Sequence, residues 1–154
     1  EALVAGYKSS FGTLRNVDTS PLYPGAKAAL DTLLAENGVV LGVATGKSRR
    51  GLDHVLTAHA LAGHFDTTQV ADDHPSKPHP SMLHACLAET GARGGVMIGD
   101  TSYDIEMGRA AGFRTLGVAW GYHPVETLER AGADIVIDSY AALADALDSL
   151  WSLA

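Results

Sequence analysis

The chain has 154 residues, 46% of them hydrophobic and 19% charged, so it can bury one sizeable core and a single domain is expected. Its formal net charge of −7 excludes any overall attraction to nucleic acid or to an anionic membrane surface. No stretch approaches the roughly 20 apolar residues of a membrane-spanning helix, and a single cysteine, Cys86, excludes an intrachain disulfide. These features predict a protein of the reducing cytoplasm with no nucleic-acid or membrane partner, and they leave its oligomeric state open.

The first fifteen residues carry apolar side chains at helical spacing, which predicts a helix over 1–15. These side chains are Leu3, Val4, Tyr7, Phe11 and Leu14. The chain opens with Glu1 inside this pattern, so the helix is expected to have further context upstream. Pro21, Pro24 and Gly25 then break the pattern, and Pro24 suits the first turn of a new helix.

After this break, strands and helices alternate along the chain. Residues 39–44 (VVLGVA) form a continuous apolar run, typical of a strand that is buried on both faces. Further strands are expected at 65–70, 96–99, 115–119 and 135–137, and helices at 24–37, 48–61, 78–90, 102–111, 124–131 and 139–150. Short strands separated by helices of this length predict right-handed crossovers and a parallel sheet.

The first polar motif, Ala44-Thr45-Gly46-Lys47-Ser48, follows the strand at 39–44 and opens a helix. Ligands of open parallel sheets bind at the carboxyl ends of the strands. A hydroxyl group beside backbone N–H groups at the start of a helix suits a phosphate or a carboxylate. The alternative is that Thr45 or Ser48 only caps the helix.

The second polar motif, Ser76-Lys77-Pro78-His79-Pro80, lies at the start of the helix expected at 78–90. Pro78 lacks a backbone donor that a helix start does not need, and it fixes the direction of the chain. It thereby fixes the direction in which Lys77 leaves the backbone. The alternative is that Lys77 is a solvated surface charge.

The third motif is the most specific, because an apolar strand ends in Gly99-Asp100 and a second carboxylate, Asp104, follows one helical turn later. The two carboxylates can face the same cavity, and hard oxygen ligands of this kind are what Mg²⁺ requires. The alternative is that Asp100 or Thr101 is the N-cap of the helix and that Asp104 interacts with the helix dipole.

Taken in this order, the three motifs resemble those of the haloacid dehalogenase superfamily over residues 21–140. The segments ATGKS, SKPHP, GDTSYDIEMGRAAG and GVAWGY are most similar to its phosphoglycolate-phosphatase-like branch. The resemblance implies an α/β, Rossmann-like, three-layer core with a parallel sheet over 21–154. Leu22-Tyr23-Pro24-Gly25 resembles the return from a helical cap into the core, which makes residues 1–20 the C-terminal remnant of that cap.

The resemblance also implies a role for each motif. Thr45 and the N–H of Gly46 bind the substrate phosphate, and Lys77 neutralises its charge. Asp100 ligates Mg²⁺, whereas Asp104 is either a second ligand or the residue that positions Lys77. The implied function is a Mg²⁺-dependent phosphomonoesterase that acts on a small phosphorylated metabolite, with phosphoglycolate favoured.

One part of the family pattern is missing from the sequence. The first family motif, Asp-x-Asp-Gly-Thr/Val on the first strand, supplies the nucleophile and the general acid/base, and Asp-x-Asp occurs nowhere in residues 1–154. We therefore expect the nucleophile to lie upstream of this chain and the fragment alone to be inactive. The alternatives are an inactive remnant or binding module, and a phosphomutase or dehalogenase of the same fold.

The missing motif also predicts a gap at the centre of the sheet. If the family order is kept, the strands at 39–44 and 96–99 should stand two strand spacings apart and should not pair. The slot between them should be empty, or filled by a segment that lies outside this sequence. Direct pairing of the two strands would refute this expectation.

Overall fold

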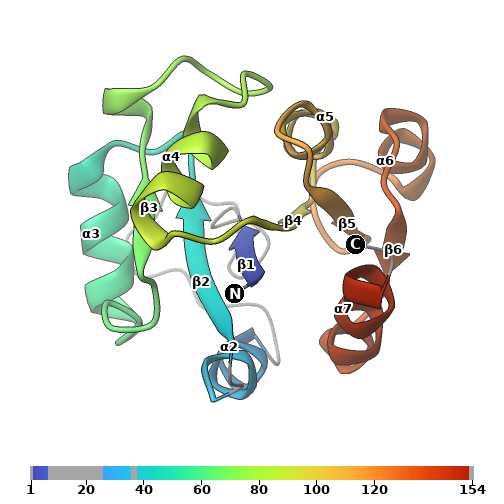
Figure 1. Ribbon diagram of the computed structural model, residues 1–154, viewed down its shortest axis with the longest axis horizontal. Helices are drawn as coiled ribbons and strands as arrows, with labels where there is room; N and C mark the ends of the chain where they lie inside the picture. Colours follow the sequence, from blue (N-terminus) through green and yellow to red (C-terminus); the bar gives the residue numbers. More distant parts are fainter. Residues whose placement is uncertain (1, 7–25, 36–37, 153–154) are drawn as a thin grey trace.

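The computed structural model describes residues 2–6, 26–35 and 38–152 of the chain. Within these ranges six strands form one parallel sheet in the order β3-β2-β1-β4-β5-β6 (Figure 1). The strands are β1 (Ala2–Gly6), β2 (Val39–Ala44), β3 (Thr67–Gln69), β4 (Gly94–Gly99), β5 (Arg114–Val118) and β6 (Ile135–Ile137). The helices are α2 (Ala26–Leu34), α3 (Arg49–Ala58), α4 (Ser81–Thr90), α5 (Ser102–Ala110), α6 (Val125–Ala131) and α7 (Leu143–Ser152), with 3-10 turns η1 (Ala71–Asp73) and η2 (Tyr140–Ala142).

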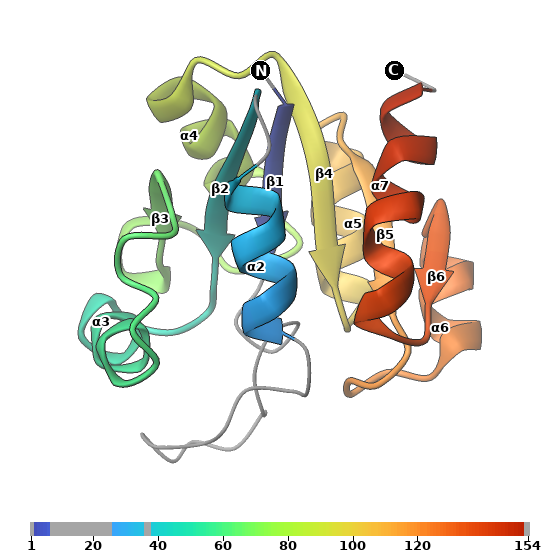
Figure 2. The same cartoon turned by 90° about the horizontal axis from the view of Figure 1, so that it is seen from below.

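Helices cover both faces of the sheet, α2 and α7 on one side and α4 and α5 on the other (Figure 2). Each face has its own apolar cluster, because successive residues of a strand point to opposite faces. In β2, Leu41 and Val43 pack with Leu30 of α2, whereas Val40 packs with Met82 of α4. This arrangement confirms the predicted α/β fold with a parallel sheet between two helical layers.

The central strand differs most from the sequence prediction. Residues Ala2–Gly6 form β1, which pairs with β2 on one side and with β4 on the other. Val4, for example, lies between Leu41 and Val96. The predicted helix over 1–15 is therefore wrong at residues 2–6, and its remainder, like the rest of the proposed cap remnant at 1–20, lies outside the described residues. A short apolar run fits either element, and here pairing on both sides satisfies its backbone groups.

The predicted separation of β2 and β4 by one strand position is confirmed, but the position is not empty. The two strands do not pair with each other, because β1 lies between them. The expectation that the slot is empty, or filled from outside the sequence, is wrong, since the chain's own residues 2–6 fill it. Thr45 and Asp100, which follow β2 and β4, therefore lie at the same edge of the sheet, separated by one strand.

The element boundaries follow local chemistry. The helix expected at 78–90 begins at Ser81, because Pro78 and Pro80 lack the N–H groups that a helix interior needs, and it ends before Gly91, whose φ is +74°. The helix expected at 139–150 divides into η2 and α7. Among the described residues no helix is long and apolar enough to cross a membrane.

Candidate active site at the carboxyl edge of the sheet

Thr45 is held at the end of β2 by two backbone contacts. Its N–H donates to the carbonyl oxygen of Gln69 at the end of β3 (3.0 Å), and its Oγ1 accepts from the N–H of Lys47 (3.1 Å). A hydroxyl that accepts one hydrogen bond can still donate its own hydrogen to a ligand oxygen. Ser48 is the residue that caps α3, through the N–H of Gly51 (3.1 Å), so the capping alternative applies to Ser48.

Lys77 forms an ion pair with Asp104 that is almost fully shielded from solvent. The Lys77 Nζ lies 2.5 Å from Asp104 Oδ1, and the two side chains are 12% and 1% exposed. The two residues are 27 positions apart in sequence, and the sheet edge brings them together. The alternative that Lys77 is a solvated surface charge is therefore wrong.

The second oxygen of Asp104 is held by Thr101. Asp104 Oδ2 accepts from the N–H of Thr101 (3.2 Å) and from its hydroxyl (2.9 Å), while the N–H of Asp104 donates to Thr101 Oγ1 (3.3 Å). This is a capping box at the start of α5. Both carboxylate oxygens of Asp104 are thus engaged within the protein, which favours the role of positioning Lys77 over that of a second metal ligand.

Asp100 is fully buried at the end of β4 and is enclosed by the loop that follows β5. Its Oδ2 accepts from the N–H of Tyr122 (3.0 Å), and its backbone oxygen accepts from the N–H of His123 (3.1 Å). A Cβ atom on Gly121 would lie 2.1 Å from the Cβ of Asp100. Gly121 is therefore required for the loop to approach this carboxylate.

The residues around Asp100 could supply only a small part of the coordination of a magnesium ion. Mg²⁺ commonly uses one or two carboxylates and completes its octahedron with water and substrate phosphate. Over the described ranges, no three His, Cys, Asp or Glu side chains gather where they could hold a metal ion. An ion bound through Asp100 would therefore take the rest of its ligands from phosphate oxygens and water, and the fully buried carboxylate would have to become accessible to them.

A pocket of about 300 Å³ brings the three sequence motifs together. Its lining comprises Gly46, Ala71, Ser76, Lys77, Met82, Thr101, Tyr103 and Asp104. The volume is at the lower end of the range for small-molecule sites. Thr45 and Asp100 are buried and are not part of this lining, so of the predicted site residues the structure exposes Gly46, Lys77 and Asp104 to the pocket.

Several residues that shape the site were not predicted from the sequence. The His123 Nδ1 accepts from the N–H of Ser102 (2.9 Å), which joins the loop after β5 to the start of α5. A Cβ atom on Gly99 would lie 2.1 Å from the Cβ of Asp104, so this glycine makes room for the ion pair. The loop after β5 could have been suspected from the sequence only through its position, because it follows a strand that ends at the same edge of the sheet.

Cys86 takes no part in the site. Burial raises the pKa of its thiol to about 11, which keeps it protonated at neutral pH. Because the thiolate is the nucleophilic form of cysteine, this buried side chain has a packing role.

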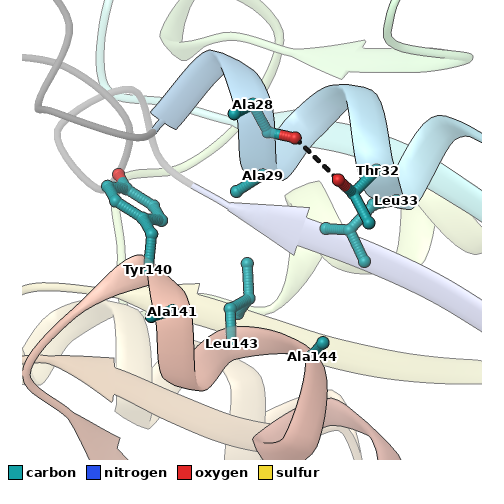
Figure 3. Close-up of a pocket in the computed structure, with 8 residues that line it drawn as sticks. All are labelled: Ala28, Ala29, Thr32, Leu33, Tyr140, Ala141, Leu143 and Ala144. Carbon is teal, nitrogen blue, oxygen red and sulfur yellow. Dashed lines mark hydrogen bonds between the residues drawn. The ribbon is translucent and has the colours of Figure 1, made fainter.

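A second cavity, of about 340 Å³, lies between α2 and the segment formed by η2 and α7 (Figure 3). It is lined by Ala28, Ala29, Thr32, Leu33, Tyr140, Ala141, Leu143 and Ala144. The Thr32 hydroxyl donates to the carbonyl oxygen of Ala28 in its own helix (2.9 Å). Since these lining residues include no carboxylate, amine, thiol or imidazole, we place no chemistry there.

Comparison with known proteins identifies the family of the chain. The family described as Haloacid dehalogenase-like hydrolase matches residues 2–118. "Probable phosphatase IndB" of Dickeya dadantii is 34% identical over 136 residues, which are 86% of this chain and 58% of that protein. "Phosphoglycolate phosphatase" of Yersinia pseudotuberculosis is 34% identical over 131 residues, 83% of this chain and 56% of that protein.

The solved structures agree at the level of the fold. The crystal structure of a predicted phosphoglycolate phosphatase from Haemophilus somnus superposes with a TM-score of 0.75 at 27% identity, and the match covers 82% of this chain and 57% of that one. The chain thus spans less than two thirds of the length of the relatives that it matches.

Proposed function

Because the chain belongs to the haloacid dehalogenase-like hydrolases, we propose that it forms the phosphate- and magnesium-binding part of a phosphomonoesterase. Membership of a family leaves the reaction open, so the function is inferred from the residues of the site. The supporting observation is the buried ion pair of Lys77 and Asp104, which borders a pocket that Gly46 also lines. A shielded cation beside backbone N–H groups at a sheet edge is suited to a phosphate group.

In this proposal each residue acts on the phosphoryl group through charge or hydrogen bonding. The Thr45 hydroxyl and the Gly46 N–H donate to phosphate oxygens, and Lys77, held by Asp104, neutralises negative charge. Fixed donors and charges of this kind stabilise the charge that develops during phosphoryl transfer. Mg²⁺, when bound through Asp100, supplies further positive charge at the phosphate oxygens.

The nucleophile is proposed to come from polypeptide outside residues 1–154, whose strand would have to replace residues 2–6 between β2 and β4. The sequence contains no Asp-x-Asp, and the central strand β1 is followed by Tyr7 rather than by a carboxylate. The missing aspartate would attack phosphorus and release the alcohol, forming an aspartyl phosphate. A second aspartate would protonate the leaving alkoxide and then remove a proton from the attacking water. Residues 1–154 alone are expected to bind phosphate without turning over an ester.

The proposed substrate is a small phosphorylated metabolite, with phosphoglycolate favoured. Support comes from the relatives with that name, at 33% to 34% identity, and from the modest size of the pocket. We also propose a cytoplasmic location, in keeping with a single, unpaired and buried cysteine.

The test begins by sequencing the gene on both sides of the segment that encodes 1–154. If an Asp-x-Asp motif lies in frame, the longer protein should be assayed with and without Mg²⁺ on 2-phosphoglycolate, a sugar 1-phosphate, pyrophosphate and a haloacid. The proposal expects Mg²⁺-dependent release of phosphate. Release of halide or isomerisation of the sugar phosphate would favour the dehalogenase or the mutase, and a native start near Glu1 without the motif would favour an inactive binding module.

Asp100→Asn in that longer protein should abolish Mg²⁺-dependent turnover, because an amide lacks the charge that the ion needs. Asp138→Asn is a matched control, since Asp138 is an exposed aspartate that follows β6. Undiminished turnover in Asp100→Asn would place the metal elsewhere.

A further inference from the structure

We propose that His74 is a positioning residue that holds the Lys77 loop in place; its relevance to phosphate binding rests on the proposed function. Lys77 lies in the segment that connects β3 to α4. His74 spans this segment, because its Nε2 lies 2.7 Å from Gln69 Oε1 at the end of β3 and its Nδ1 lies 2.7 Å from Ser81 Oγ at the start of α4. One imidazole thus joins the two ends of the segment that carries Lys77.

The surrounding hydrogen bonds determine which nitrogen of His74 carries a hydrogen. The Gln69 Nε2 donates to Thr67 Oγ1 (2.9 Å) and to Glu89 Oε2 (2.8 Å), so the oxygen of this amide faces His74. Gln69 Oε1 can only accept, and His74 Nε2 must therefore donate. In the neutral ring Nδ1 then accepts the hydroxyl hydrogen of Ser81.

This network is buried where it meets the sheet. Thr67 and Gln69 are 3% and 4% exposed, and the Thr67 hydroxyl donates to Glu89 Oε1 (2.9 Å). Because Gln69 is shielded from water, its oxygen depends on the His74 donor, and loss of that donor leaves a buried acceptor unsatisfied. The network therefore favours one position of the His74 ring.

The beginning of the same segment is fixed separately to the first polar motif. The N–H of Ala71 donates to the carbonyl oxygen of Lys47 (3.0 Å), and Asp72 Oδ1 accepts from the N–H of Arg49 (3.2 Å). The later of these contacts is at Asp72, five residues before Lys77. His74 continues the attachment to within three residues of Lys77, which is why we assign it the positioning role.

The test compares two replacements that separate ring shape from hydrogen bonding. His74→Phe keeps a ring and removes both nitrogens, whereas His74→Gln keeps an N–H donor for Gln69. His84→Ala is the control, because His84 is exposed on α4. Wild type and the three variants are studied as folded full chains by ¹⁵N NMR of histidine and lysine side chains.

We expect wild-type His74 to carry hydrogen on Nε2 and to lack it on Nδ1 in its neutral form. The Lys77 Nζ signal, protected by the ion pair with Asp104, should be lost in His74→Phe while the sheet amides keep their shifts. It should be retained in His74→Gln and in His84→Ala. A residue that only stabilised the fold would lower the unfolding midpoint without changing the Lys77 signal in the folded protein.

Binding of inorganic phosphate in the presence of Mg²⁺ gives the functional readout. We expect His74→Phe to weaken it roughly tenfold. This is the lower end of the range for outer partners of metal ligands, taken as a guide because His74 likewise acts through neighbouring residues. If wild type binds no phosphate, the proposed function fails, while the Lys77 spectra still decide the role of His74. A hydrogen on Nδ1 in neutral wild-type His74, an unchanged Lys77 signal in folded His74→Phe, or its loss in His74→Gln would each overturn the inference. Should His74→Phe fail to fold, the wild-type tautomer and the His74→Gln spectrum decide it.

Discussion

Replacing Lys77 with methionine tests the ion pair with Asp104, because methionine keeps an unbranched apolar stem and removes the charge. The paired atoms lie 2.5 Å apart. At an effective dielectric constant of about 20, two unit charges at that separation attract by roughly 6 to 7 kcal/mol. Ordering of the lysine side chain opposes this by up to about 2 kcal/mol, and desolvation of both groups opposes it further.

The expected loss of stability follows from what remains around Asp104. Removing one partner of a buried pair typically costs about 3–5 kcal/mol. Asp104 keeps its hydrogen bonds from Thr101, so we expect the lower end, about 3 kcal/mol in the free energy of unfolding.

Urea denaturation measures this loss as a shift in midpoint at constant slope. A double-mutant cycle with Asp104→Asn isolates the coupling between the two side chains. Lys27→Met is the control, since Lys27 is exposed on α2, and it should change stability by no more than about 0.5 kcal/mol. If Lys77→Met lowers the free energy of unfolding no more than Lys27→Met does, the ion pair is not formed in solution.

Three further changes test other parts of the molecule. Gly121→Ala places a methyl group 2.1 Å from the Cβ of Asp100 and should abolish Mg²⁺-dependent phosphate binding measured by calorimetry, whereas Gly94→Ala, with open space around it, should not. Thr101→Val removes the N-cap hydroxyl of α5 and should cost about 1 kcal/mol in urea denaturation; no loss would contradict the capping box. Burial raises the pKa of the Cys86 thiol on folding from 9.0 to about 11. The protonated thiol therefore stabilises the fold fully below pH 9, and the free energy of unfolding should fall by up to about 3 kcal/mol between pH 9 and pH 11. Cys86→Ala should lack that decline.

The sequence predicted most of the fold because its signals are local. The β-branched run at 39–44 and the glycine that ends α4 determine their elements without help from distant residues. The apolar spacing across residues 1–15 predicts a helix, and this prediction is wrong at residues 2–6, which form a strand. Over those five residues alone the pattern carries too little periodicity to distinguish helix from strand. Their true state depends on β2 and β4, which lie more than thirty residues away in sequence.

The candidate site was also predictable in part, because its three motifs follow from the order of strands and helices. The convergence of Gly46, Lys77 and Asp104 on one pocket follows from segments that meet at the carboxyl edge of a parallel sheet. The choice between the two roles of Asp104 depends on contacts of its separate oxygens, and the approach of Gly121 to Asp100 depends on the path of a loop. Neither is encoded in residue spacing.

NMR mapping of phosphate binding to the chain tests the proposed phosphate and magnesium site directly. Inorganic phosphate with Mg²⁺ should shift the backbone amide of Gly46, the amide of Thr101 and the Nζ of Lys77, which all border the pocket. The same additions should leave these signals unchanged in Asp100→Asn, because the ion that joins phosphate to the protein is no longer held. Shifts confined to another part of the chain, or shifts at these three residues that persist in Asp100→Asn, would contradict a phosphate and magnesium site at this edge of the sheet.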